Sequence, residues 1–201
     1  MLQILCVLHQ LTAYATRMIG KTIALWNPAN KRFVRMTSAH ELDKSAQSSD
    51  GSLPSSWTQE LFKVMDAGDG MVALYNLVQK RFIRMPDGQY MDKSLERPDR
   101  TLPSTWTWEV FRVVYVYTDI VAFYNPWHKR FMRMMTSETK MDKSSVREDG
   151  TLESHFDAER FKIVESQQEP GGAFAFTNTF HRTRPGTGTI CTHVHYVYFR
   201  W

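Results

Sequence analysis

Hydrophobic and polar residues alternate with a period of two in short runs along this chain, and the runs recur. Three of them, at residues 22–26, 71–75 and 120–124, place one pair of apolar side chains on the same parity: Ile23/Leu25, Val72/Leu74 and Val121/Phe123. Alternation of this kind, with β-branched and aromatic residues, predicts a half-buried strand. An asparagine then opens a four-residue segment, which predicts a tight turn held by a bond from the asparagine side chain to the backbone ahead.

A second strand is predicted after each turn, where the sequence Lys-Arg-Phe-x-Arg-Met appears. Both parities of this segment carry bulky side chains, so we expect the strand to be covered on both faces along part of its length. A short Asp-Lys-Ser segment follows, with groups suited to turn formation. A polar loop then leads to a large aromatic residue before the fourth strand, namely Trp57, Trp106 or Phe156. Because one such ring removes roughly 150–250 Å² from water, we expect these three to be among the largest contributors to the core.

The unit formed by these elements occurs three times. Arg32, Arg81 and Arg130 occupy the same position in successive copies and are 49 residues apart, which is the signature of an internal repeat. The repeats span about residues 19–67, 68–116 and 117–165, and four strands in each give twelve. A propeller needs about four to eight blades, and an open solenoid would leave exposed edges. The prediction is therefore an all-β chain that closes as a β-trefoil.

Two segments lie outside the repeats. Residues 1–18 form an N-terminal extension, in which Ala13-Tyr14-Ala15 has the form of a signal-peptide cleavage site, although no basic residue precedes the apolar stretch. We expect a cytoplasmic protein, with secretion as the alternative. The tail, residues 166–201, contains a partial fourth repeat, because Phe174–Arg182 can be aligned with Val121–Lys129. It is either the start of a second trefoil or a strand that replaces the first one at the barrel seam.

Charge and cysteine content narrow the classes of partner. The 201 residues carry 25 Lys and Arg against 21 Asp and Glu, but residues 19–165 hold 21 against 20, a net of +1, and the other +3 lies outside. A nearly neutral repeat region predicts no nucleic-acid partner. Cys6 and Cys191 lie outside the repeats, so no disulfide framework is expected. No apolar run is long enough for a membrane span.

The candidate ligand-binding residues lie on the three predicted hairpins. Arginine offers a planar fork to phosphate, sulfate or an acidic protein surface, and aromatic rings stack on sugars. The set comprises Trp26, Asn27, Lys31, Arg32, Tyr75, Asn76, Lys80, Arg81, Tyr124, Asn125, Lys129 and Arg130, with Trp127 as a further aromatic. The alternative is structural, with arginine stems covering aromatic rings and aromatic side chains packing against neighbouring strands.

No catalytic or metal-binding pattern emerges. The Asp43-Lys44-Ser45 trio resembles a catalytic set only superficially, because it occurs in three copies and turn hydrogen bonds explain its residues. His193 and His195 have no third metal ligand at a convincing spacing. The sequence also contains no Gly-rich phosphate loop, no Gly-x-Ser-x-Gly elbow and no Cys-x-x-Cys pair. We therefore expect a protein that is not an enzyme and that holds no cofactor or metal.

The segment Trp57–Tyr75 resembles the repeat of fascin-like β-trefoils, in the actin-crosslinking-protein-like superfamily. It contains Trp-x-x-Glu-x-Phe-x-Val, a Gly-bearing turn and Val-Ala-Leu, and the resemblance extends over about Ile19–Glu165. It implies a non-catalytic, protein-binding module with actin as a candidate partner. One alternative is a carbohydrate-binding, lectin-type trefoil with up to three quasi-equivalent sites, although the Gln-x-Trp signature of ricin-type lectins is missing. A second alternative is a structural domain of a longer protein.

Overall fold

The computed structural model of the chain describes residues 15–166, which form twelve strands and a helical turn at residues 15–18. The first repeat contains β1 (Thr22–Asn27), β2 (Arg32–Arg35), β3 (Asp43–Lys44) and β4 (Phe62–Gly68). The second contains β5 (Met71–Asn76), β6 (Arg81–Arg84), β7 (Asp92–Lys93) and β8 (Phe111–Tyr117). The third contains β9 (Ile120–Asn125), β10 (Arg130–Arg133), β11 (Asp142–Lys143) and β12 (Phe161–Ser166).

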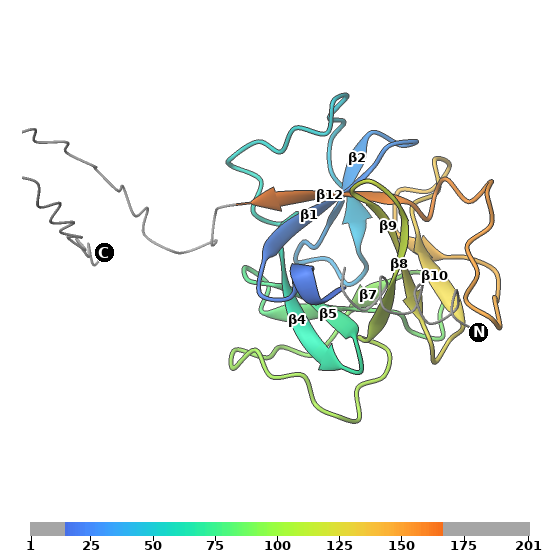
Figure 1. Cartoon of the computed structure of the whole chain (residues 1–201). Helices are drawn as coiled ribbons and strands as arrows, with labels where there is room; N and C mark the ends of the chain where they lie inside the picture. Colours follow the sequence, from blue (N-terminus) through green and yellow to red (C-terminus); the bar gives the residue numbers. More distant parts are fainter. Residues whose placement is uncertain (1–14, 167–201) are drawn as a thin grey trace, which may run out of the picture. The chain divides into compact units, whose positions relative to one another are not determined.

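Six of the strands close into a barrel. Antiparallel pairing runs from β1 to β4, β5, β8, β9 and β12, and β12 returns to β1. The closing pair is visible in Figure 1, where β12 in orange lies beside β1 in blue. This architecture confirms the predicted all-β, twelve-stranded β-trefoil. Since β1 itself occupies the seam, no replacement strand is needed there, and Phe174–Arg182 lie outside the described residues.

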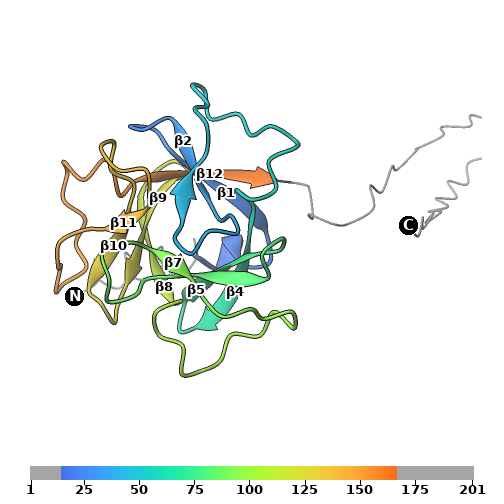
Figure 2. The same cartoon turned by 180° about the vertical axis from the view of Figure 1, so that it is seen from behind.

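The other six strands form three hairpins that cap one end of the barrel (Figure 2, where β10 and β11 lie side by side). A ring of backbone hydrogen bonds joins them around the pseudo-threefold axis. The amide of Leu42 donates to the carbonyl of Met91 (3.0 Å), Met91 to Met141 (2.9 Å), and Met141 back to Leu42 (2.9 Å). Beneath the ring all three side chains are buried. Each repeat therefore completes its cap only in the presence of the other two.

The first strand of each repeat is buried on both faces, so the half-buried prediction is wrong. Ile23 and Leu25 of β1 pack in the barrel core, whereas Ala24 packs with Phe33 and Leu61 in a second, outer cluster. The loop between β3 and β4 folds over the outer face of the strand and supplies part of that cluster. The prediction for the second strand is confirmed, because Phe33 and Val34 are buried on its opposite faces.

The loop aromatics contribute less to the core than predicted. Trp57 and Trp106 are only partly buried and pack edge-on against Phe33 and Phe82, with ring centroids 6.2 and 6.4 Å apart. Their positions on connecting loops place them over the outer clusters rather than inside the barrel. The interior is filled instead by the first residues of the fourth strands, Phe62, Phe111 and Phe161, which are fully buried.

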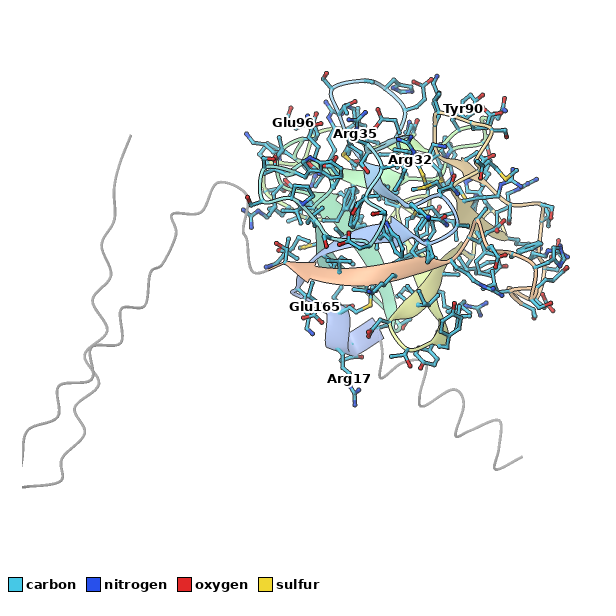
Figure 3. The ribbon with its side chains drawn as sticks, turned by 90° about the horizontal axis from the view of Figure 1, so that it is seen from above. Arg17, Arg32, Arg35, Tyr90, Glu96 and Glu165 are labelled. Carbon is cyan, nitrogen blue, oxygen red and sulfur yellow. The ribbon has the colours of Figure 1, made fainter. Side chains whose placement is uncertain are left out.

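The trefoil begins earlier than the predicted boundary at Ile19. Ala15 and Met18, on the helical turn, are buried and belong to the main core cluster. The amide of Gly20 donates to the carbonyl of Val64 at 2.8 Å, which ties this turn to β4. Arg17 projects into solvent at the end of the molecule opposite Arg32 and Arg35 in Figure 3. Residues 15–18 are therefore part of the folded body.

Candidate functional site

The hairpin asparagines are buried turn residues. Asn27, Asn76 and Asn125 are completely buried, and each side-chain oxygen accepts the amide three residues ahead at 2.8 Å. This is the turn bond that the sequence predicts. Each side-chain amide also donates to backbone carbonyls just before a fourth strand, and these bonds could not be predicted because their acceptors lie far away in the sequence. These three candidates therefore brace the fold and lie beneath the surface.

Two of the candidate aromatic rings are also inside the fold. Tyr75 and Tyr124 are 1% and 4% exposed, and their hydroxyls donate to the carbonyls of Arg97 (2.8 Å) and Arg147 (2.7 Å). Trp26 is partly buried and donates its indole N–H to the carbonyl of Ser48 at 3.0 Å. The loops that cover β1, β5 and β9 thus enclose these rings, which leaves no open face on either tyrosine for a sugar.

The two arginines of each hairpin make regular structural contacts. Arg81 donates from Nη1 to the carbonyl of Ser94 at 2.6 Å, and Arg32 and Arg130 make the equivalent bond at 2.5 Å. The second arginine makes a two-point ion pair across the hairpin, which for Arg84 and Asp92 measures 2.7 and 2.6 Å. Carboxylate–guanidinium pairs of this geometry fix both side chains. The aspartate of each Asp-Lys-Ser trio therefore has a structural role.

The serine of the trio is structural as well. Ser94 Oγ accepts the amide of Phe82 at 3.0 Å and donates to the carbonyl of Leu95 at 2.8 Å, and the other two repeats share this arrangement. We expect Ser94→Ala to lower the unfolding free energy by about 1–2 kcal/mol, because a buried amide loses its acceptor. Urea denaturation would measure the loss. Ser104→Ala, at an exposed loop position, is the control and should change little; equal stability of both variants would contradict the role given to Ser94.

A surface cleft of about 610 Å³ opens beside the second-repeat hairpin. The β5–β6 turn, strand β6 and the β7 region line it, and the loop after β2 of the first repeat supplies the opposite wall. The lining side chains are mainly polar and cationic: Ser38, His40, Val78, Gln79, Lys80, Arg81, Arg84, Lys93, Ser94, Leu95 and Glu96. Of the twelve sequence candidates, Lys80 and Arg81 meet in this cleft.

A smaller hollow of about 190 Å³ adjoins the cleft, and both are lined by Arg84 and Leu95. Trp106 and Trp108 form part of its wall. The Arg84 guanidinium lies over the Trp108 ring, 5.6 Å from its centroid, which is within the range of a cation–π contact. Aromatic surface and cationic groups are therefore combined in one continuous depression.

The cleft is electropositive. Lys93 Nζ donates to the carbonyl of Thr37 at 2.6 Å, and burial, followed by the nearby Arg81 guanidinium, lowers the pKa of Lys93. Lys80 is exposed and makes no side-chain hydrogen bond or ion pair within residues 15–166. Glu96, which is labelled in Figure 3, is the one carboxylate in the lining, and its side chain is exposed. Cations thus outnumber carboxylates, and an anionic group would relieve their mutual repulsion.

Sequence reasoning missed several residues of this cleft. His40 comes from the preceding repeat, and only the folded cap brings it to the hairpin of the second. Lys93 did carry a signal, because a lysine recurs between Asp and Ser in all three repeats. Its side chain reaches across to the loop of the preceding repeat, as Lys44 and Lys143 also do toward Met135 and Pro86.

Buried glutamates lie behind the arginines of the hairpins. Burial, with a smaller contribution from the neighbouring Asp92 and Asp142, raises the pKa of Glu109 and of Glu159 to about 7, against the opposing effect of Arg84 and Arg133. The pKa of Glu60 is raised for the same main reason. Each repeat thus places a protonatable carboxyl next to its Arg–Asp pair.

No known family model matches the sequence of this chain, and no curated protein sequence is significantly similar to it. Its fold is that of β-trefoils of known structure. It matches the designed threefold-symmetric protein ThreeFoil with a TM-score of 0.53 and 13% identity, over 71% of this chain and 97% of that one. The BEL β-trefoil gives a TM-score of 0.55 and 8% identity, over 74% and 94%.

A third match covers part of a larger enzyme. The GlcNAcα1-4Gal-releasing endo-β-galactosidase from Clostridium perfringens has a TM-score of 0.56 and 11% identity, and the match covers 73% of this chain but only 33% of the enzyme. At these identities the likeness shows the fold alone. Within residues 15–166, no helix is long and apolar enough to cross a membrane.

Proposed function

We propose that this β-trefoil is a non-catalytic carbohydrate-binding module whose principal site is the cleft beside the second-repeat hairpin. The observation that carries the proposal is the cleft itself, which at about 610 Å³ has the size of a small-ligand site. Its hydrogen-bonding side chains suit the hydroxyl-rich surface of a sugar. Trp106 and Trp108 in the adjoining hollow add apolar surface next to them.

One structural neighbour gives this proposal further support. The endo-β-galactosidase named above acts on a glycan and includes a segment of the same fold. At 11% identity that likeness carries no information on the residues of the cleft, so the proposal depends on the site geometry. The earlier expectation of up to three quasi-equivalent sites on the hairpins is replaced here by one principal site.

Protein binding is the second candidate, and it includes the fascin-like interpretation with actin as partner. Tyr115 and Tyr117 on β8 are 44% and 55% exposed, and exposed tyrosines are common in protein interfaces. They lie on the barrel hairpin β8–β9 and do not line the cleft. Substitutions in the cleft would therefore weaken glycan binding, whereas substitutions of the two tyrosines would weaken protein binding. If the domain is purely structural, neither set of substitutions would change the binding of a ligand.

A glycan array probed with the full chain, run beside sedimentation with filamentous actin, tests the proposal. We expect array binding that free sugar displaces. The double variant Lys80→Ala/Leu95→Ala should weaken binding at least about fivefold, since it removes one charged and one apolar contact. Val146→Ala, at an exposed position of the third repeat, should leave binding unchanged. Actin pelleting without glycan binding, or glycan binding unaffected by the double variant, would overturn the proposed site.

A further inference from the structure

Each repeat carries the same four cations around its hairpin. They are Lys31, Arg32, Arg35 and Lys44 in the first repeat, Lys80, Arg81, Arg84 and Lys93 in the second, and Lys129, Arg130, Arg133 and Lys143 in the third. In every copy the last lysine donates to a carbonyl of the preceding repeat's loop, counted cyclically. The three hairpins thus share this set of four cations, which form a cationic floor, and they differ in the loop that faces the floor.

In the first repeat, the facing loop carries an acidic residue. Lys44 donates to the carbonyl of Met135. Burial, followed by the Arg32 guanidinium, lowers the pKa of Lys44, and the carboxylates of Glu138 and Asp142 oppose this shift. Glu138 belongs to the loop that follows β10 of the third repeat. An incoming anion would therefore be repelled by this loop while the floor attracts it.

In the third repeat, two carboxylates oppose an anion. Lys143 donates to the carbonyl of Pro86. Burial, followed by the Arg130 guanidinium, lowers the pKa of Lys143, and Asp87, next to Pro86, opposes this shift together with Asp92. Lys129 forms an ion pair with Glu148. The exposed lysine of this copy therefore already has a protein anion as partner.

In the second repeat, Lys80 has no carboxylate partner among the described residues, and the acidic residue of the facing loop, Glu41, pairs with Lys140 instead. The same loop presents Ser38 and His40 to the cleft. Pro98 occupies the position of Glu148, because Arg97 and Arg147 make the same 2.7 Å backbone bond to Lys80 and Lys129. Within the described residues, no carboxylate acts to raise the pKa of Lys93. The two lysines of this copy are consequently the least compensated by carboxylates, and the lining of the 610 Å³ cleft that opens here holds one carboxylate, Glu96, against four Lys and Arg side chains.

We infer that the second-repeat cleft binds the anionic group, sulfate or carboxylate, of an acidic glycan, with Lys80, Arg81 and Lys93 as its main contacts. The inference rests on the proposed function, since it names the ligand class of the same site. Lys80 and Lys93 have N–H donors to offer, and Arg81 retains donors beyond its bond to Ser94. Glu138, Asp87 and Glu148 exclude the same ligand from the other two copies.

Titration calorimetry with three oligosaccharide probes tests this inference on the full chain. The probes are a sulfated tetrasaccharide, an unsulfated tetrasaccharide of the same backbone that keeps its carboxylates, and a neutral tetrasaccharide. We expect one site, a preference for an anionic probe over the neutral one, and an affinity that falls as salt rises. Lys80→Gln should weaken the anionic probe about fivefold, as loss of about 1 kcal/mol requires. Lys162→Gln, which makes the same charge change on β12 outside the cleft, should change it less than about twofold.

A gain-of-function variant tests the exclusion. Asp87→Asn/Glu148→Gln removes the charges of two carboxylates that face the third-repeat lysines, and we expect the number of anionic probes bound to rise from one to two. The inference would be overturned if the double variant still bound one anionic probe, or if Lys80→Gln and Lys162→Gln lost affinity for the anionic probe to the same extent. Binding of the neutral probe as tight as that of the anionic probes would overturn it while the proposed function stands. No binding of any probe would overturn the proposed function as well.

Discussion

Raising the pH from about 5 to about 8 is expected to lower the unfolding free energy of the trefoil by about 3–6 kcal/mol, because two buried carboxyls must ionise. The pKa of Glu109 and of Glu159 is raised to about 7, above an ordinary value of 4.5. The folded state therefore holds protons that the unfolded chain has released. Their stabilising effect is fully present below pH 4.5 and is lost as the pH rises through about 7.

Burial is the main cause of this pH dependence. Glu109 is buried beside the Arg84–Asp92 pair. The Arg84 guanidinium already makes two hydrogen bonds to the Asp92 carboxylate, so its positive charge is largely neutralised before Glu109 ionises. Glu159 lies in the same way beside Arg133 and Asp142. An ionised carboxylate in such a place has little compensation for its lost hydration.

Thermal melting between pH 5 and pH 8 would measure the effect. The double variant Glu109→Gln/Glu159→Gln should lose most of the dependence, since a neutral amide has no proton to release. Glu96→Gln, at an exposed position, should keep the dependence of the unsubstituted chain. A melting temperature that stays constant over this range in the unsubstituted chain would contradict the assignment.

Replacing Asn125 by alanine is expected to lower the unfolding free energy by about 2–4 kcal/mol, because several buried backbone groups lose their partners at once. Its side-chain amide donates to the carbonyls of Thr107, Trp108 and Val110 at 3.0–3.2 Å, and its oxygen accepts the amide of His128 at 2.8 Å. These bonds connect the β9–β10 turn with the loop before β8.

Chemical denaturation would measure that loss. Trp127→Ala lies two residues away at a position that is 66% exposed, and a surface substitution of this kind should change stability by less than about 0.5 kcal/mol. If Asn125→Ala proved as stable as Trp127→Ala, the bracing role of the asparagine would be refuted.

The fold could be predicted from local patterns. The 49-residue spacing, the asparagine turns and the two-faced second strand all depend on residues close together in sequence. The outer burial of Ala24 could not be predicted, because the loop that covers it begins some twenty residues later. The enclosure of Tyr75 has the same origin, since its partner is the carbonyl of Arg97.

Only the cationic residues of the candidate site could be predicted from the sequence. Lys80 and Arg81 follow from the repeat, but the cleft also requires Ser38 and His40 from another repeat. The difference among the three copies comes from single residues in facing loops, such as Asp87 and Glu148, whose neighbours are set by the closed cap. A repeat pattern alone treats the three copies as equal.

The most direct test of the central claim, that one cleft of the second repeat is the ligand site, is to map the binding surface by amide chemical shifts. The isotope-labelled full chain would be titrated with the sulfated tetrasaccharide. We expect the largest shifts at Lys80, Arg81 and Lys93, smaller shifts around His40 in the wall from the first repeat, and no shift at the equivalent third-repeat positions. Equal shifts on all three hairpins, or shifts confined to Tyr115 and Tyr117, would contradict the claim.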